Sequence, residues 1–235
     1  MYKIQNVSIV IPAHNEENNL RLNIKTIHEY LAKLLGCNFE IILVENGSTD
    51  RTAVIAKELE TEYPNLKAFF LPTPSYGEAY RYGILRANYD MVTVHPVDLA
   101  FSLNFIERAY RLLNKFTVIL GVRYHQKSKV SRPSIRNLIS RVHTKFVNTL
   151  FDMHYNDVNC LKAFRTPVGK KLVKLTTAKG PFIEVELVCL LNAKSLKFYE
   201  IPLNHIEEEI ARHPLYIVRS ILKNFIELFK LKFHK

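Results

Sequence analysis

Apolar and polar residues follow two different patterns along the chain. Short runs rich in β-branched residues, such as 7–11 and 91–94, are typical of buried strands, whereas 20–35 carries apolar residues three or four positions apart, as a helix does. The pattern predicts strands at 7–11, 39–44, 67–71, 91–94 and 117–122, with helices at 20–35, 52–62, 79–87 and 103–113 between them. This alternation predicts an α/β fold, with a mostly parallel central sheet that helices cover on both faces.

Two later segments are both amphipathic and basic. Residues 122–151 hold seven basic residues and no acid, together with apolar residues at helical spacing, and 213–235 repeats this design. Basic amphipathic helices bind anionic membrane surfaces, although an apolar stripe that packs on the sheet has the same spacing. We therefore predict one domain over 1–212, followed by a C-terminal basic amphipathic helix over 213–235.

The composition is that of a globular protein, and its charge is unevenly distributed. Of 235 residues, 48% are hydrophobic and 23% are charged. Residues 1–121 hold 12 Lys and Arg against 13 Asp and Glu, whereas residues 122–235 hold 21 against 9. A basic half suits nucleic acid, an anionic membrane or a phosphorylated substrate, unless it is only a solvated face. We expect no nucleic acid partner, because the sequence contains no recognised nucleic-acid-binding module.

Nothing in the sequence predicts a membrane span or secretion. The longest apolar runs are far too short to cross a bilayer, and the start of the sequence lacks the cleavage site of a secretory signal. Cys37, Cys160 and Cys189 are odd in number and lack the spacing of a zinc site or a disulfide framework, which predicts free thiols in a reducing compartment. We expect a cytoplasmic protein that is peripheral to the inner face of the membrane.

One acid stands directly beyond the apolar strand at 91–94. The stretch MVTVHPVDLAF places His95, a proline and then Asp98 after this strand. Open α/β sheets bind ligands in the crevice beyond the carboxyl ends of their strands, so Asp98 is a candidate site residue on position alone.

Four segments, in this order and spacing, resemble the family 2 glycosyltransferases: VSIVIPAHNEENNL, EIILVENGSTDRT, SYGEAYRYGILRANYDMVTVHPVDL and DVNCLKAFR. The resemblance extends over most of the chain and is closest to the polyprenyl-phosphate sugar transferases typified by dolichyl-phosphate mannose and glucose synthases. It implies a Rossmann-like nucleotide-diphospho-sugar transferase fold. It also implies an inverting hexosyltransferase that moves a sugar from a nucleotide-diphosphate donor to a polyprenyl phosphate at the membrane surface.

The resemblance also implies the residues that bind the donor. Those that stand where the family's first loop contacts the nucleoside are Pro12, Ala13, Asn15 and Glu16. Glu45 stands where an acid accepts a hydrogen bond from the base, or else it packs against the turn at Ser48. Gly77 allows close approach of the backbone to a diphosphate at a helix N-terminus, or else it is a turn glycine.

The metal site that the resemblance implies is incomplete in this chain. Family members usually carry Asp-x-Asp beyond the fourth strand, but Pro96 replaces the first acid and leaves Asp98. His95 is a candidate substitute ligand, or a hydrogen-bonded structural residue, for a divalent Mg²⁺ or Mn²⁺ ion that prefers oxygen ligands. Where a metal is lacking, Arg and Lys must neutralise the leaving diphosphate, and Arg123 directly follows the fifth strand.

A polyprenyl phosphate is already ionised at neutral pH, so its transfer needs no strong general base. The candidate acceptor-binding residues are Arg132, Arg136, Lys162 and Arg165, with Arg141 on the same basic helix. The alternative interpretation is that these residues are ordinary solvated charges that bind no acceptor. The resemblance also implies an acid near Asn156 or Asp157, and we list Asp98, Arg123 and Asp157 as candidate catalytic residues. Weaker candidates on the same ground are Glu184, Glu186 and Arg212.

The departures from the family pattern leave a second hypothesis open. Pro96, Ala100 and Cys160 stand at positions where family members usually carry Asp, Gln and Gly. The chain would then be a catalytically degenerate protein that keeps the fold as a binding or scaffold module in glycan assembly.

Overall fold

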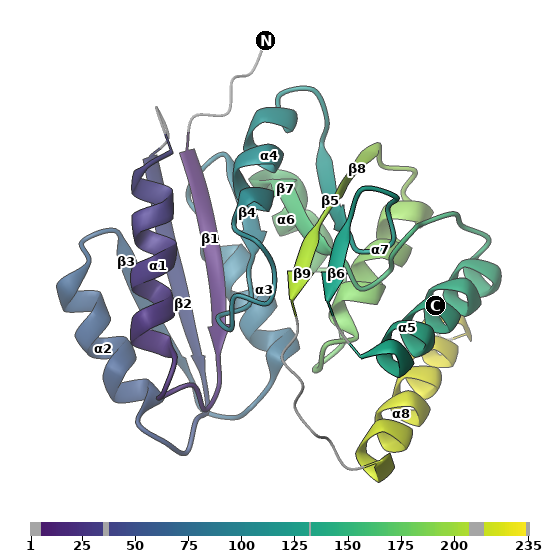
Figure 1. Cartoon of the computed structure of the whole chain (residues 1–235), viewed down its shortest axis with the longest axis horizontal. Coiled ribbons are helices and arrows are strands. Elements are labelled where there is room, and N and C mark those ends of the chain that lie inside the picture. Colours follow the sequence, from purple (N-terminus) through teal and green to yellow (C-terminus); the bar gives the residue numbers. More distant parts are fainter. Residues whose placement is uncertain (1–5, 35–37, 132, 207–213, 234–235) are drawn as a thin grey trace.

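The computed structural model describes residues 6–34, 38–131, 133–206 and 214–233, which form a twisted sheet with helices on both sides (Figure 1). Seven strands lie in the order β3-β2-β1-β4-β7-β5-β8. Their bounds are β1 Asn6–Ala13, β2 Asn38–Asn46, β3 Leu66–Leu71, β4 Met91–Val94, β5 Val118–Val122, β7 Leu161–Arg165 and β8 Phe198–Pro202. All neighbours pair in parallel except β7, which runs antiparallel to both β4 and β5. The predicted α/β fold with a mostly parallel sheet is confirmed.

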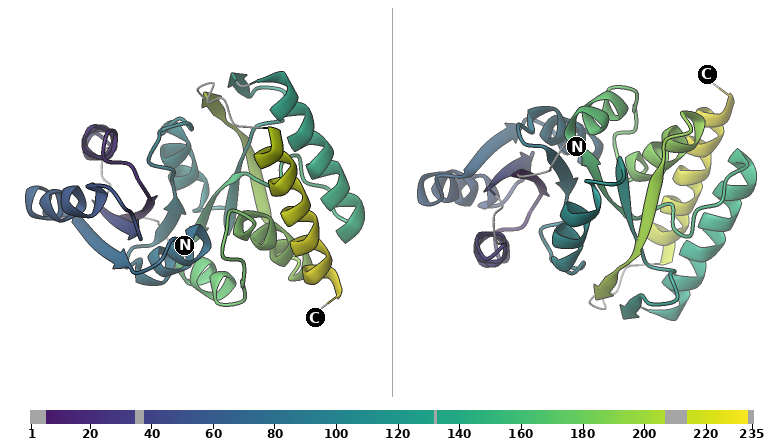
Figure 2. Two further views of the ribbon diagram at one scale, coloured as in Figure 1. Left: turned by 90° about the horizontal axis from the view of Figure 1, so that it is seen from below. Right: turned by 90° about the horizontal axis from the view of Figure 1, so that it is seen from above.

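Helices cover the sheet because each buries one apolar stripe against it. One core cluster joins the sheet to α1 (Leu20–Ala32), α2 (Thr52–Glu62) and α4 (Asn104–Leu112). The cluster on the opposite face includes residues of α3 (Tyr76–Arg86), α6 (Thr166–Val173) and α7 (Ile183–Ala193). The two views of Figure 2 show these layers on either side of the strands.

Two outer helices and a short ribbon complete the second half of the chain. The ribbon pairs β6 (Lys129–Ser131) with β9 (Asn204–Ile206) in parallel. The helices, α5 (Ser134–Phe151) and α8 (Pro214–Phe233), lie side by side in both views of Figure 2. Their contacts include Phe146 against Phe225 at 4.8 Å between ring centroids, and Leu228 of α8 is fully buried. The C-terminal helix therefore packs on the body of the protein through at least this part of its apolar stripe.

The strands and helices predicted up to residue 122 agree with the structure in kind and differ mainly at their ends. Beyond it, β6 lies within the segment 122–151 that was predicted to be helical, and β7, β8 and β9 were not predicted. We predicted a helix from residue 79, but α3 begins at Tyr76 because the Ser75 side chain caps it by accepting a hydrogen bond from the N–H of Glu78 (3.3 Å). Within the described ranges, no helix has both the length and the apolar character needed to cross a membrane. Cys160 and Cys189 are buried free thiols, as predicted, whereas Cys37 lies outside the described residues.

Candidate active site

The loops that follow β1 and β2 lie against each other beyond the sheet. The parallel register pairs Ala13 with Glu45, so the two strands end together. The side-chain oxygen of Asn15 accepts a hydrogen bond from the N–H of Thr49 (2.9 Å), and the Thr52 hydroxyl accepts one from the N–H of Glu16 (2.8 Å). Asn15 has a φ of 54°, a left-handed conformation that asparagine tolerates better than most residues. The predicted donor residues of the first loop are thus held in one fixed conformation, with Pro12 and Ala13 buried in β1.

Glu45 packs against the turn at Ser48, which was one of the two roles predicted for it. Its side chain is buried, and its carboxylate accepts a hydrogen bond from the N–H of Ser48 at 2.6 Å. This bond closes the turn at Gly47, whose φ is 61°. A contact from Glu45 to the nucleotide base stays a prediction.

The close approach predicted at Gly77 exists, but the partner is protein backbone. A Cβ atom at this position would lie 2.1 Å from the carbonyl oxygen of Ala178. The N–H of Gly77 donates to the carbonyl of Lys179 at 2.8 Å, so this N–H is not free to hold a diphosphate. The prediction that Gly77 admits a diphosphate therefore needs correction: the glycine admits the segment that precedes α7.

Two carboxylates influence each other beyond the ends of β1 and β4. Asp98 is exposed, and it accepts a hydrogen bond from the N–H of Ala100 at 3.0 Å. Burial and then the negative charge of Asp98 raise the pKa of Glu16, which places the two acids within electrostatic range of each other. The described residues contain no group of three or more His, Cys, Asp or Glu side chains that could hold a metal ion.

His95 is set apart from this exposed pair. It is fully buried, its Nδ1 lies 3.0 Å from the carbonyl of Pro96, and its Nε2 has no hydrogen-bond partner among the described residues. Burial lowers the pKa of His95, which favours the neutral ring. His95 was a candidate metal ligand or a structural residue. The structure supports the structural role, because both ring nitrogens are buried, whereas Asp98 is exposed to solvent.

Arg123 and Asp157 form a buried ion pair. The carboxylate of Asp157 accepts hydrogen bonds from Nε (2.8 Å), Nη2 (2.9 Å) and the backbone N–H (3.1 Å) of Arg123, and a fourth from the N–H of Asn159 (3.1 Å). Burial alone would raise the pKa of Asp157, but the charge and hydrogen bonds of Arg123 outweigh it and lower this pKa. Since all these bonds occupy its two oxygens, Asp157 orients Arg123 and is not a free catalytic acid or base.

Lys162 and Arg165, both predicted to bind the acceptor, lie at opposite ends of β7. Lys162 is fully buried, and its ammonium donates to the carbonyl of Cys160 at 2.7 Å. Arg165 donates from Nε to the carbonyl of Leu113 (3.0 Å) and from Nη2 to that of Asn114 (3.1 Å), at the end of α4. The prediction is wrong for Arg165, because this end of β7 lies at the edge of the sheet away from Asp98. Lys162 cannot touch an acceptor without a rearrangement.

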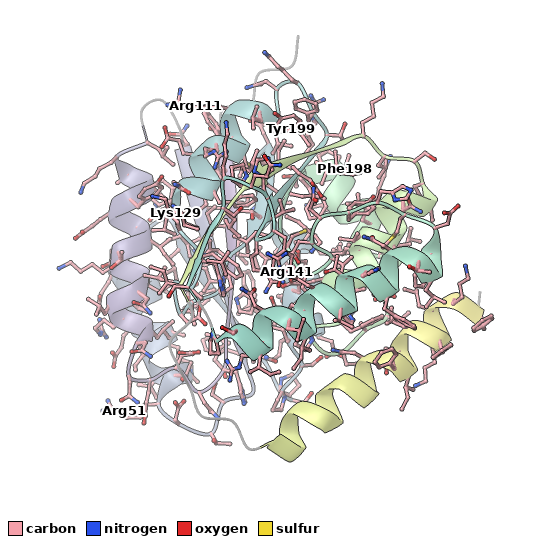
Figure 3. All side chains as sticks on the ribbon, turned by 45° about the vertical axis from the view of Figure 1, so that its right-hand side comes forward. Arg51, Arg111, Lys129, Arg141, Phe198 and Tyr199 are labelled. Atoms are coloured by element: carbon pink, nitrogen blue, oxygen red, sulfur yellow. The ribbon has the colours of Figure 1, made fainter. Side chains whose placement is uncertain are left out.

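The other predicted acceptor residues lie on or before α5. Arg132 is outside the described residues, as is Arg212, the weaker candidate near the donor diphosphate, and Arg136 is half-buried in the first turn of α5. Arg141 projects from α5 toward the loop after β5, where its guanidinium lies over the ring of Tyr124 at 4.7 Å from the centroid (Figure 3). On the same ring, Arg123 lies 5.5 Å from the centroid. Arg141 is thus brought close to the Arg123–Asp157 pair.

A cavity of about 450 Å³ opens at this pair of arginines. Arg123, Tyr124, Asn137 and Arg141 contribute to its walls. The hydroxyl of Tyr124 and the side-chain oxygen of Asn137 are buried without a hydrogen-bond partner among the described residues. The two guanidinium groups and the unused Tyr124 hydroxyl are donors around one cavity, which favours an anionic ligand such as a phosphate.

Two tyrosines of the site were not predicted from the sequence. Tyr76 donates a hydrogen bond to Glu184 at 2.8 Å, and Tyr124 lies between two guanidinium groups. Each is the sequence neighbour of a predicted site residue, Gly77 or Arg123. Nothing in a single sequence, however, distinguishes a tyrosine of the site from a tyrosine of the core. Glu186, a weaker candidate, accepts backbone hydrogen bonds from Thr177 and Ala178 and is structural.

Comparisons with known proteins concern the sequence and the fold of the chain. A family model described as Glycosyl transferase family 2 matches residues 8–170. A dolichyl-phosphate beta-glucosyltransferase of Trichomonas vaginalis is 28% identical over 96% of this chain and 72% of the relative. A dolichol-phosphate mannosyltransferase of Pyrococcus furiosus is 31% identical over 57% of this chain, and the match spans only 38% of that relative.

Solved structures share the fold at low sequence identity. Glucosyl-3-phosphoglycerate synthase from Mycobacterium tuberculosis, in complex with Mn²⁺, UDP and glucosyl-3-phosphoglycerate, has a TM-score of 0.67 at 17% identity, with 95% of this chain and 80% of that chain covered. A mannosyltransferase from Pyrobaculum calidifontis, in complex with GDP-Man and Mn²⁺, has a TM-score of 0.64 at 15% identity, with 97% and 65% covered.

Proposed function

We propose that this chain, which belongs to glycosyl transferase family 2, moves one sugar from a nucleotide-diphosphate donor to the phosphate of a polyprenyl lipid at a membrane surface. Membership of the family makes the chain a glycosyltransferase. The names of the two dolichyl-phosphate and dolichol-phosphate relatives support the lipid acceptor. The observation that carries the proposal is the cavity between Arg123 and Arg141, which suits a phosphate and opens beside an apolar stripe.

The donor end of the site is the pair of loops after β1 and β4. The neighbouring structures with bound UDP or GDP-Man support a nucleotide donor at these strand ends. We assign the nucleoside to the loop of Pro12, Ala13, Asn15 and Glu16, and the diphosphate to the neighbourhood of Asp98. Glu45 is the candidate base contact.

Two carboxylates are compatible with a divalent ion that also binds the donor diphosphate. Mg²⁺ is commonly held by one or two protein carboxylates together with substrate phosphates, so Asp98, assisted by Glu16, would hold Mg²⁺ or Mn²⁺ there. The ion would contribute neutralisation of the diphosphate charge. The remaining neutralisation must come from the cations of the second half of the chain, with Arg123 fixed in place by Asp157.

The acceptor end of the site is the cavity below α5. Arg123 and Arg141 provide the cations for the acceptor phosphate, and Arg136 and Arg132 lie earlier on the same basic segment. Asn137 and Arg141 are part of the cavity wall. The residues that follow them, Leu138 and Val142, are 58% and 59% exposed. An apolar chain attached to the phosphate would therefore leave the cavity over these side chains.

Transfer between these two ends requires little proton chemistry. An oxygen of the acceptor phosphate attacks the anomeric carbon, a new carbon–oxygen bond forms, and the bond to the donor diphosphate breaks with inversion. The nucleoside diphosphate leaves with the electron pair. Because the attacking oxygen is already anionic, the residues of the site need only orient it and neutralise charge, and no free general base is required.

Exposed apolar side chains on the outer helices support a membrane surface as partner. Large hydrophobic residues exposed by between 48% and 68% are Ile135, Leu138 and Val142 on α5 and Ile226, Phe229 and Phe233 on α8. Lys230 and Lys232 follow on α8, and Arg141 and Lys145 on α5. Apolar side chains flanked by cations suit the interface of an anionic membrane. We therefore place the chain as a peripheral protein on the cytoplasmic face.

The test supplies the purified chain with labelled nucleotide sugars and polyprenyl phosphate in anionic vesicles, with Mn²⁺, with Mg²⁺ or with a chelator. We expect transfer of the label to the lipid, and a rise of about tenfold in the acceptor KM on Arg141→Met, with the donor KM unchanged. Arg111→Met is the matched control, because Arg111 is an exposed arginine on α4 (Figure 3). No transfer from any donor would contradict the proposal, and tight nucleotide binding without turnover would favour a non-catalytic binding module.

A further inference from the structure

Lys162 is a buried cation to which the proposed function gives no task. Its side chain has no exposed surface, although Lys162 is the second residue of β7, near the edge of the sheet where Asp98 lies. Removing a lone ammonium from water is costly unless a counter-charge and hydrogen bonds replace the water. Its partners are the carbonyl of Cys160 at 2.7 Å and the carboxylate of Glu184, whose Oε2 lies 4.0 Å from Nζ.

Glu184 connects this buried cation to the surface of the site. Its side chain is 20% exposed, and its Oε1 accepts a hydrogen bond from the Tyr76 hydroxyl at 2.8 Å. Burial and then the charge of Glu184 raise the pKa of Tyr76 well above its ordinary value, so the phenol keeps its proton and remains a donor. One oxygen of the carboxylate is thus fixed by Tyr76, and the other faces the ammonium of Lys162.

Glu184 lies within electrostatic range of groups at both ends of the proposed site. Tyr76, which contacts Glu184, also experiences the charge of Asp98 at the donor end. Arg123, at the acceptor end, experiences the charge of Glu184. A sugar that passes from a diphosphate near Asp98 to a phosphate near Arg123 must cross this region.

We propose that Lys162 is a positioning residue that holds the Glu184 carboxylate in place against the transferred sugar. The inference rests on the proposed function, because it takes the sugar to lie between donor and acceptor. A carboxylate accepts hydrogen bonds from sugar hydroxyls, and its charge stabilises the positive charge that develops at the anomeric carbon when the bond to the leaving group breaks. The positive charge of Lys162 offsets the cost of keeping the Glu184 carboxylate partly buried, and the hydrogen bond from Tyr76 fixes the orientation of this carboxylate.

The experiment separates sugar contact from nucleotide contact. Calorimetry on the full chain gives the Kd of a nucleotide sugar and of the same nucleotide diphosphate. The Kd of the nucleotide diphosphate divided by that of the nucleotide sugar measures the contribution of the sugar, and this ratio falls when a contact to the sugar is lost. We expect Glu184→Gln and Lys162→Met each to reduce this ratio about tenfold, and Glu184→Gln to lower kcat by roughly 100-fold, since a charged hydrogen bond and transition-state stabilisation are lost. Lys194→Met, a substitution of an exposed lysine at the other end of α7, should change neither.

The double variant decides whether Lys162 acts through Glu184. If it does, Lys162→Met combined with Glu184→Gln should match Glu184→Gln alone in both the ratio and kcat, because the cation has lost its target. Effects that multiply would overturn the inference. So would a Lys162→Met variant that unfolds at a lower temperature but keeps the wild-type ratio, since the lysine would then only support the fold, for instance through its favourable charge on Asp157.

A second variant covers the case in which Lys162→Met does not fold. Tyr76→Phe removes one hydroxyl from the same carboxylate, and we expect a loss of about fivefold in the ratio and no change in the Kd of the nucleotide diphosphate. A wild-type ratio in Tyr76→Phe would overturn the inference. If the wild-type chain binds no nucleotide sugar, the proposed function fails and this inference with it; if it binds and transfers while the variants behave as wild type, only this inference fails.

Discussion

The buried pair of Arg123 and Asp157 gives the sharpest prediction for stability. In Asp157→Asn the amide NH₂ must take the place of one carboxylate oxygen. Each oxygen accepts two hydrogen bonds, Oδ2 from the N–H and Nε of Arg123 and Oδ1 from Nη2 and the N–H of Asn159. Whichever way the amide turns, its NH₂ therefore faces two donors, and the guanidinium keeps a buried charge without a counter-charge.

The expected loss of stability follows from measurements on buried ion pairs in other proteins. Breaking a buried ion pair by removing one charge lowers the free energy of unfolding by about 3–5 kcal/mol. For a chain of this size each kcal/mol lowers the melting temperature by about 2–4 °C, so we expect a drop of roughly 10 °C. Asp152→Asn is the matched control, because Asp152 is exposed in a left-handed conformation (φ 50°) that asparagine also adopts.

The same prediction has a pH dependence with a defined sign. The folded-state pKa of Asp157 is lowered, so the stability that the carboxylate contributes is present above its unfolded-state pKa and is lost as the pH falls through the folded-state value. Urea unfolding of wild type and Asp157→Asn should thus show a constant difference near neutral pH that shrinks below about pH 4. A variant that is as stable as wild type at pH 7 and has lost only kcat would refute this argument and restore Asp157 as a catalytic acid.

Three further substitutions test the placement of individual residues. Gly77→Ala should lower the free energy of unfolding by about 1–3 kcal/mol, since the new Cβ would overlap the segment before α7, whereas Gly180→Ala has open space and should be neutral in the same thermal melts. Arg165→Met should cost about 1–3 kcal/mol through two lost hydrogen bonds to carbonyls and leave the acceptor KM unchanged; a raised acceptor KM would return Arg165 to the site. Asp98→Asn should weaken nucleotide-diphosphate binding in calorimetry about tenfold or more with Mn²⁺ and far less with a chelator, and equal losses would argue against a metal at Asp98.

Periodicity predicted β1 to β5 of the sheet, because most of these strands are buried and read as continuous apolar runs, whereas β7 and β8 were not predicted. The β-branched run of β1 and the MVTV of β4 needed no tertiary information, and the position after β4 singled out Asp98, whereas Asn15 and Glu16 were candidates only through the family resemblance. Capping and loop contacts, such as that of Ser75 with Glu78, depend on single hydrogen bonds. They shift the ends of elements without changing the elements themselves.

Direction and burial of individual charges were not predictable in the same way. Lys162 and Arg165 stand three residues apart, and only the antiparallel pairing of β7 shows that they belong to opposite edges of the sheet. Asp157 looked like a catalytic acid because the sequence does not reveal that Arg123 already occupies it. The sequence shows the sign of the charge at each position. The role of that charge depends on which partner the fold brings within hydrogen-bonding distance.

The antiparallel course of β7 also explains how the two halves of the chain share one site. The first half is nearly neutral and provides the exposed acid Asp98, whereas the basic second half provides Arg123, Arg141 and Lys162. A transfer between two phosphate groups brings two anions together, so positive charge must lie close to the acid. Because β7 enters between β4 and β5 and begins at their carboxyl ends, it places Lys162 beside the strand that leads to Asp98 and the strand that leads to Arg123. A parallel β7 would carry the same lysine to the opposite edge, and the site would lose the cation that faces Glu184.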